Sequence, residues 1–150
     1  MTATYLLDTN VVLRLPASIL RSRTVTHHSH IPEEVLYEAR FAQHIDQFRH
    51  RTMPVTAGVL DALQQVWESI PEDDTTVVDL FRGKGNADPL LIAIVLDQRA
   101  KAATGLFADT WTIVSLDGPV RTLAGRFDIP AIELAEFVDL ANGLRPSPSN

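Results

Sequence analysis

The sequence predicts an α/β fold with a parallel sheet at its centre. A short apolar strand over residues 4–8 runs directly into the polar residues Asp8, Thr9 and Asn10. An apolar strand indicates a sheet that is covered on both faces, and the abrupt polarity indicates the carboxyl edge of that sheet. Further along the chain, segments of strand character alternate with segments of helical periodicity, which is the α/β pattern.

The composition favours one ordinary core. The chain has 150 residues, of which 45% are hydrophobic, so we expect a single domain over residues 1–145 and a disordered tail over 146–150. Cysteine is absent, which excludes a disulfide framework and a thiolate metal site. We find no leader and no apolar run long enough to cross a bilayer, and therefore expect a cytoplasmic protein with no membrane partner.

The charges are unevenly distributed. The formal net charge of −6 argues against a protein that binds nucleic acid with its whole surface, because phosphate neutralisation supplies most non-specific affinity. Arginine and histidine gather in the first third of the chain, whereas acidic residues cluster later. This distribution is compatible with a basic face beside an acidic site.

The first half of the chain predicts mainly helices after the opening strand. We expect a short helix over 10–16 that ends at a proline, and a polar loop over 21–30. A proline and two acids then open a longer helix that reaches about residue 49, because acids in the first turn meet the positive end of the helix dipole. Residues 53–56 fit either a brief strand or an extended connection.

The second half continues the alternation. We expect helices over 59–67, 77–81, 87–103, 120–127 and 134–140, and strands over 111–115 and 129–132. The helix over 87–103 is apolar enough to be buried on most sides. The last strand contains Pro130, which is tolerated only at an edge of the sheet.

Four carboxylates are the candidate functional groups. Asp8 follows a strand, where it serves equally well as a helix cap or as a ligand. Glu38 falls on the apolar face of its predicted helix, where a carboxylate is costly unless a cation or a proton donor meets it. Glu34, one turn earlier, is the alternative to Glu38. Asp88 opens the most buried helix and either caps it or stays free, and Asp117 follows the strand over 111–115, on the same edge as Asp8.

Carboxylates that converge without cysteine indicate an oxygen-rich site for a hard cation. Mg²⁺ and Mn²⁺ prefer such ligands. Asp8, Asp88 and Asp117 would bind the metal, and Glu38 would complete the site. In a two-metal scheme one cation activates a water and a second steadies the leaving oxygen of a phosphodiester, although the sequence does not decide between one ion and two.

Four segments in order resemble the PIN-domain nucleases, and most closely the toxin ribonucleases of VapC type. The segments are LLDTN over 6–10, VLYEA over 35–39, ADPLLIA over 87–93 and IVSLD over 113–117. The resemblance implies a three-layer α/β/α sandwich with a central parallel sheet of four or five strands. It also implies a metal-dependent endoribonuclease that hydrolyses RNA, with Asp8, Glu38, Asp88 and Asp117 as the catalytic acids.

The resemblance assigns further residues and partners. Thr9, Asn10 and Ser115 match the polar neighbours that orient ligands or water, and the candidate RNA contacts are Arg14, Arg40 and Lys84. The partners implied are an RNA substrate, a cognate antitoxin and a second copy in a homodimer.

Three other interpretations stay open. The chain could be a housekeeping RNA-processing nuclease of the same family, or a non-catalytic module of that family that binds RNA or protein. A phosphatase of haloacid dehalogenase type would use Asp8 as a nucleophile. That pattern requires a second aspartate two residues later, where this chain has Asn10.

Overall fold

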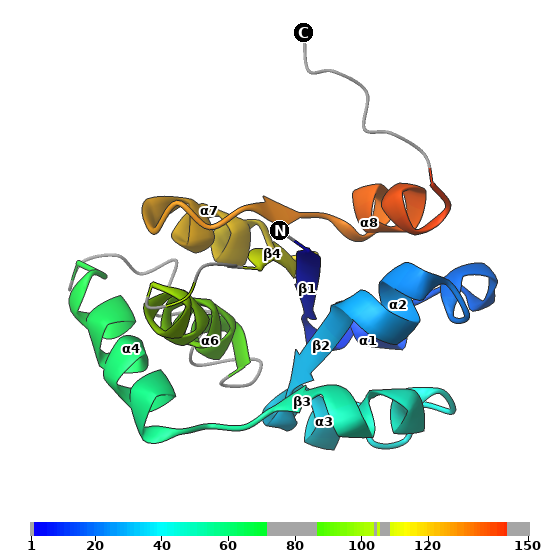
Figure 1. Ribbon diagram of the computed structural model, residues 1–150, viewed down its shortest axis with the longest axis horizontal. Coiled ribbons are helices and arrows are strands. Elements are labelled where there is room, and N and C mark those ends of the chain that lie inside the picture. The colour runs from blue at the N-terminus through cyan, green and yellow to red at the C-terminus, as the bar shows by residue number, and fades with distance from the viewer. Residues whose placement is uncertain (1, 72–86, 104, 106–108, 144–150) are drawn as a thin grey trace, which may run out of the picture.

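Five parallel strands form one sheet at the centre of the molecule (Figure 1). The computed structural model describes residues 2–71, 87–103, 105 and 109–143. The strands are β1 Ala3–Leu7, β2 Ser29–Pro32, β3 Thr52–Met53, β4 Thr110–Val114 and β5 Ala131–Ile132. Their spatial order is β3-β2-β1-β4-β5, so the chain builds outward from β1 in one direction and then in the other.

Helices cover both faces of this sheet, which confirms the predicted three-layer α/β sandwich (Figure 1). The helices are α1 Thr9–Leu13, α2 Arg23–His28, α3 Glu33–Glu38, α4 Ala57–Glu68, α6 Ala87–Ala102, α7 Gly118–Arg126 and α8 Leu134–Ala141, with 3-10 turns η1 Ala17–Ile19 and η2 Ile45–Arg51. One core cluster joins α4, α6 and α7 to the sheet, and the other joins α1, α2, α3 and α8 to its opposite face.

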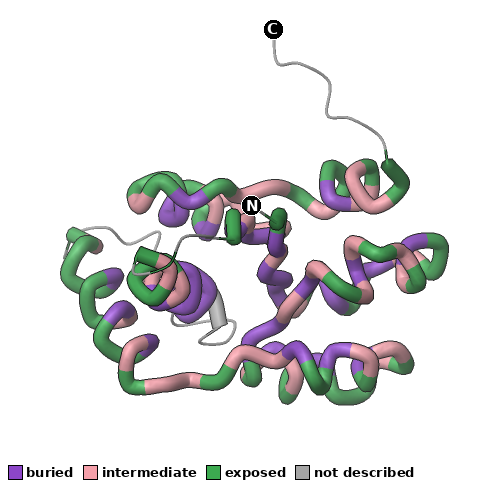
Figure 2. The backbone as a smooth tube through the Cα atoms, viewed as in Figure 1, coloured by how far each residue is buried: buried purple, intermediate pink, exposed green. Residues whose placement is uncertain are grey.

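Neighbouring strand residues alternate between these two cores. Leu6 and Ile113 pack into the first core, and Leu7 and Val114 pack into the second. All four residues are fully buried. Figure 2 shows buried stretches of the backbone, in purple, in the central part of the molecule. The apolar strand pattern therefore predicted the covered sheet for the correct physical reason.

Helices α4 and α6 pack against each other within the first core. Thr56 begins α4 by accepting a hydrogen bond from the backbone N–H of Val59 at 3.3 Å. Gly58 lies so close to α6 that a Cβ built on it would be 2.2 Å from Asp97 Oδ1. Asp97 in turn pairs with Lys101, with 2.7 Å between Oδ2 and Nζ. A side chain at position 58 would therefore collide with a buried carboxylate.

The segment 21–30 is helix and strand rather than the predicted loop. Ser22 caps α2 by accepting from the backbone N–H of Val25 at 3.3 Å, and β2 follows directly. The buried guanidinium of Arg51 donates to the backbone carbonyls of Val25 and Ser29. Tertiary hydrogen bonds thus order a polar stretch that has little local signal, apart from the serine cap.

The predicted helix over 31–49 is two separate elements. Helix α3 ends at Glu38, and the backbone N–H of Ala39 returns to the carbonyl of Val35. After a turn, η2 buries Ile45 and Phe48. The apolar residues of the predicted helix are buried in one core, as their spacing indicated. The backbone bends between α3 and η2, so the two elements reach that core separately.

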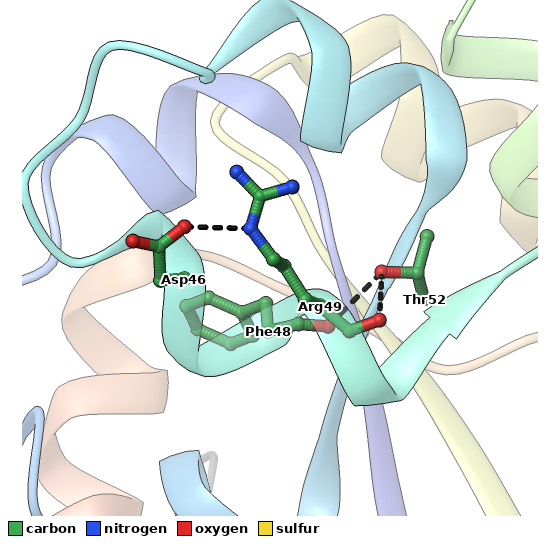
Figure 3. A network of polar contacts seen from close by, with 4 residues as sticks. All are labelled: Asp46, Phe48, Arg49 and Thr52. Atoms are coloured by element: carbon green, nitrogen blue, oxygen red, sulfur yellow. Dashed lines mark hydrogen bonds and ion pairs between the residues drawn. The ribbon is translucent and has the colours of Figure 1, made fainter.

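Thr52 ends η2 and begins β3 (Figure 3). Its hydroxyl donates to the backbone carbonyls of Phe48 and Arg49, at 3.0 and 3.1 Å. On the same turn, Arg49 Nε lies 2.6 Å from Asp46 Oδ1, and both of these side chains are largely exposed. The hydroxyl satisfies carbonyls that the short turn leaves without a helical partner.

The remaining elements agree with the sequence within a few residues at each boundary. Helices α4, α6, α7 and α8 and strand β4 occupy the predicted segments, and β5 is an edge strand as Pro130 required. The predicted helix over 77–81, the position of Lys84 and the tail over 146–150 lie outside the described residues. Among the described helices, none has the length and apolar character needed to span a membrane.

Candidate functional site at the carboxyl edge of the sheet

The ends of the two central strands bring Asp8 and Ser115 together. In the parallel pair of β1 and β4, Leu7 lies opposite Val114, and the backbone N–H of Asp8 donates to the Val114 carbonyl at 3.1 Å. The Ser115 hydroxyl donates to Asp8 Oδ2 at 3.0 Å. Residues 107 positions apart in sequence therefore form one contact because both strands point the same way.

Asp8 is a buried carboxylate with only 3% of its surface exposed. Its Oδ1 accepts the backbone N–H of Thr9 at 2.7 Å, so it also has the capping role at the start of α1. Burial raises the pKa of Asp8, and the negative charges of Asp117 and Glu38 add to this, while the hydrogen bonds from Thr9 and Ser115 lower it. Burial therefore makes the charged form of the Asp8 carboxylate energetically costly.

Glu38 approaches Asp8 through Thr9. The Thr9 hydroxyl donates to Glu38 Oε2 at 2.6 Å, which links the end of α3 to the start of α1. Glu38 is exposed and does not point into a core as predicted, because α3 ends at this residue. Partial burial raises the pKa of Glu34, and the charges of Glu38 and Glu33 raise it further. Glu38 has the direct link to Thr9, which supports it over Glu34.

Asp117 lies at the turn between β4 and α7. Its backbone N–H donates to Ser115 Oγ at 3.1 Å, and its own carboxylate makes no capping hydrogen bond to α7. The Ser115 hydroxyl therefore joins the turn to Asp8. The negative charge of Asp117 adds to the burial that raises the pKa of Asp8.

Arg121 supports this turn and was missed in the sequence analysis. Its Nη1 donates to the Ser115 carbonyl at 2.9 Å, and its Nη2 pairs with Glu133 Oε1 at 2.9 Å. The spacing from Asp117 was the available signal, because a residue four positions on lies one helical turn later. The sequence could not show that its side chain turns back to the strand end.

The other predicted site residues lie in different surroundings. Asn10 and Arg14 are exposed on and just after α1, and Arg40 is exposed after α3. Asp88 is the second residue of α6, and its side chain is outside the described part of the chain, as is all of Lys84. The structure thus brings together Asp8, Thr9, Glu38, Ser115 and Asp117.

The expected metal site stays a prediction. Among the described side chains, no group of three or more histidine, aspartate or glutamate residues is arranged to hold a metal ion. Both Asp8 oxygens accept hydrogen bonds from the protein. The side chain of Asp88, the third predicted ligand, lies outside the described part of the chain.

The arrangement is suited to a ligand with a positive charge or several hydrogen-bond donors. Its carboxylates accept hydrogen bonds, and its position between β1 and β4 is where the sheet order reverses direction. Open α/β sheets bind ligands outside the carboxyl ends of the strands at this reversal.

No family model matches the chain. Over 106 residues the chain is 34% identical to a tRNA (guanine-N(7)-)-methyltransferase of Streptomyces coelicolor (strain ATCC BAA-471 / A3(2) / M145). The matched part is 65% of this chain and 39% of that protein, so the chain spans about two fifths of the relative's length.

This similarity contradicts the prediction of a PIN-domain ribonuclease. The relative is a methyltransferase, so the predictions of a metal-dependent hydrolase and of a toxin are wrong. The housekeeping nuclease, the non-catalytic module of that family and the phosphatase do not fit this similarity either. The short motifs misled because they specify only acids at strand ends, which many parallel sheets share. The expected RNA, antitoxin and second copy are tested by none of these findings.

Proposed function

We propose that the chain takes part in transferring a methyl group to the N7 atom of a guanine in RNA, with its site at the carboxyl edge of the sheet. The reaction is suggested by the similarity to the tRNA (guanine-N(7)-)-methyltransferase. The location is suggested by the structure, and the two arguments are independent of each other.

The observation that carries the proposal is the contact between Asp8 and Ser115 at the ends of β1 and β4. The chain leaves β1 for β2 on one side of the sheet, and β4 lies on the other side. Helices that follow two such strands diverge and leave a crevice, where nucleoside-type ligands bind in α/β proteins. Asp8, Thr9 and Asp117 all lie on the segments that leave these two strands.

The charge of the site fits the reaction. When bound, S-adenosylmethionine would supply the methyl group to the lone pair of guanine N7, the electron pair of the broken carbon–sulfur bond would stay on sulfur, and the positive charge of the sulfonium would pass to the guanine ring. No proton leaves N7, so the site needs negative potential more than it needs a base. Asp8, Glu38 and Asp117 supply that potential. Burial is the main cause of the raised pKa of Asp8, and a cation beside it would offset both the burial cost and the smaller repulsion from Asp117 and Glu38.

The proposal is tested with the methyl donor and an RNA acceptor. S-adenosylmethionine is titrated into the protein by calorimetry, and transfer of its labelled methyl group is followed on an unmodified tRNA transcript. We expect binding and transfer by wild type, and in Asp8→Asn a donor affinity lowered by roughly 10- to 100-fold together with reduced transfer. The matched control is Asp61→Asn, since Asp61 is exposed on α4. A wild-type protein that neither binds the donor nor labels the RNA contradicts the proposal.

The same titration tests the metal prediction. It is repeated with Mg²⁺, with Mn²⁺ and after chelation. Binding of either ion by wild type and not by Asp8→Asn would support the predicted metal ligands, whereas donor binding unaffected by chelation would show that the site works without a cation of this kind.

A further inference from the structure

Two aromatic rings are unusually exposed next to the candidate site. Phe41 has 86% of its surface exposed and Tyr37 has 67%, on the end of α3 and the turn that follows it. Large apolar side chains are normally buried, and an exposed group of them marks a binding surface more often than a packing defect. Neither ring is needed to fill the core below α3, where Val35 and Ala39 are buried.

Arg40 holds these two rings together. Its guanidinium lies 4.2 Å from the ring centre of Tyr37 and 4.6 Å from that of Phe41. Its Nη1 also donates to the backbone carbonyl of Tyr37 at 2.8 Å. Cation–π contacts and one hydrogen bond thus order a long side chain that would otherwise move freely in solvent. The result is a group of three flat surfaces with one positive charge.

A cleft of about 500 Å³ opens beside this group. Phe41 and Leu13 form apolar parts of its lining, and His44 is fixed there by a 2.8 Å contact between its Nε2 and the Val12 carbonyl. Glu38 also lines the cleft, and it accepts the hydrogen bond from Thr9 at the candidate site. Glu38 therefore links the cleft to the candidate site, and the cleft volume lies within the roughly 300–1,000 Å³ typical of small-molecule pockets.

We propose that Tyr37, Arg40 and Phe41 bind an unpaired base of the RNA substrate by stacking. Aromatic and guanidinium planes are the groups on which proteins stack single-stranded bases, and an arginine beside them also meets the phosphate backbone. The proposal rests on the proposed function for its RNA substrate. It adds the surface that positions the RNA beside the carboxylates.

The positive charge of Arg40 favours RNA, rather than the cationic methyl donor, as the ligand of this surface. Arg40 lies against the ring of Phe41, which lines the cleft, so its guanidinium places positive charge beside the cleft although Glu38 also lines it. Asp8 and Asp117 place negative charge at the strand ends. Phosphates are attracted to the first region, and the cationic donor is attracted to the second. The two parts of the surface thus select the two reactants.

The test measures base stacking directly. A short single-stranded RNA that contains 2-aminopurine is titrated into wild type, Phe41→Leu, Tyr37→Leu and the control Leu60→Ala. Leucine keeps an apolar side chain but removes the aromatic plane, and Leu60 is an exposed apolar residue on α4. We expect quenched 2-aminopurine fluorescence with wild type and with the control, and a loss of affinity of roughly 5- to 150-fold in each aromatic variant.

The outcomes separate this inference from the proposed function. Equal RNA affinity and equal quenching in wild type and Phe41→Leu would overturn the inference. So would sedimentation showing a wild-type dimer that Phe41→Leu converts to monomer, because the rings would then be covered by a second copy. Failure of wild type to bind S-adenosylmethionine, with stacking still lost in both aromatic variants, would overturn the proposed function alone.

Discussion

Asp8 and Asp97 are both buried carboxylates, yet their surroundings differ. Asp8 is 3% exposed and Asp97 is 6% exposed. Asp97 has Lys101 one helical turn away, with 2.7 Å between the charged atoms. Asp8 accepts hydrogen bonds from a backbone N–H and a hydroxyl, and its charged neighbours are the acids Asp117 and Glu38. No ion pair to Asp8 is found within the described part of the chain.

This difference indicates that Asp8, rather than Asp97, has a negative charge available to bind a ligand. A buried charge is stable when a partner of opposite sign lies beside it, which is the arrangement at Asp97. At Asp8 neutral donors reduce the cost and acidic neighbours increase it. A structural carboxylate would be replaceable by an amide without loss of function, so each of the following predictions contrasts the two residues.

The largest expected effect is a separation of function from stability. Asp8→Asn should lower the affinity for S-adenosylmethionine by roughly 10- to 100-fold, because it removes a charged acceptor. It should not lower the melting temperature, since the amide keeps the Thr9 contact and ends the repulsion. Asp97→Asn should lower the melting temperature and leave the affinity for S-adenosylmethionine unchanged. Calorimetric titration and thermal unfolding of both variants decide this, and equal loss of stability in both would remove the distinction.

Gly58→Ala tests the packing around Asp97. The new Cβ would lie 2.2 Å from Asp97 Oδ1 without movement, so the carboxylate and its contact to Lys101 must shift. We expect a loss of about 1–3 kcal/mol of unfolding free energy, typical of overpacking in a core. Urea unfolding of Gly58→Ala, Asp97→Ala and the double variant provides the check. Additive losses would show that the glycine and the carboxylate do not interact.

Ser115→Ala tests the network around Asp8. The hydroxyl donates to the buried Asp8 and accepts from the backbone N–H of the partly buried Asp117, so its removal leaves each partner with one hydrogen bond fewer. We expect a loss of about 1–2 kcal/mol of stability and a further rise in the pKa of Asp8. Ser115→Thr is the matched control because it keeps the hydroxyl. Urea unfolding of alanine and threonine variants at the same pH would show the contrast.

The pH dependence of stability gives a smaller effect with a defined sign. Burial raises the pKa of Asp8 from its ordinary value of 3.8. The folded state therefore holds the proton longer than the unfolded state, and stability falls as the pH rises from 3.8 through the raised value. The difference in unfolding free energy between Asp8→Asn and wild type should grow over this interval and then level off. A difference independent of pH would show that Asp8 does not titrate in this way.

The smallest effect is expected at an exposed carboxylate. Asp46 pairs with Arg49 at 2.6 Å, but the two side chains are 76% and 61% exposed (Figure 3). Solvent screens such a pair, so Asp46→Ala should change stability by less than about 0.5 kcal/mol. Thermal unfolding of wild type and Asp46→Ala at low and high salt measures this change in stability. A larger loss would mean that burial is not what separates Asp8 and Asp97 from other acids.

The sequence predicted most of the sheet and its covering helices. Leu6 and Leu7, followed at once by Asp8, indicated a strand buried on both faces that ends at a ligand-binding edge. The apolar run in α6 likewise marked a buried helix. These patterns are local, because each depends on the spacing of apolar residues within one element.

The same patterns failed where distant residues decide the backbone. The segment over 21–30 became α2 and β2, where Arg51 donates to its carbonyls, and α3 ends at Glu38, which accepts a hydrogen bond from the distant Thr9. The ribonuclease prediction failed for a related reason. Short acidic motifs mark strand ends, and the same strand ends occur in proteins with other chemistry.

The sequence by itself determined that an acid would stand at the end of the first strand, with others at comparable ends later in the chain. Only the tertiary structure decided which of them meet. Parallel pairing of β1 with β4 placed Ser115 against Asp8, and the early end of α3 left Glu38 exposed and joined to Thr9. Strand pairing and helix ends are set by contacts across the whole fold, so no local pattern contains them.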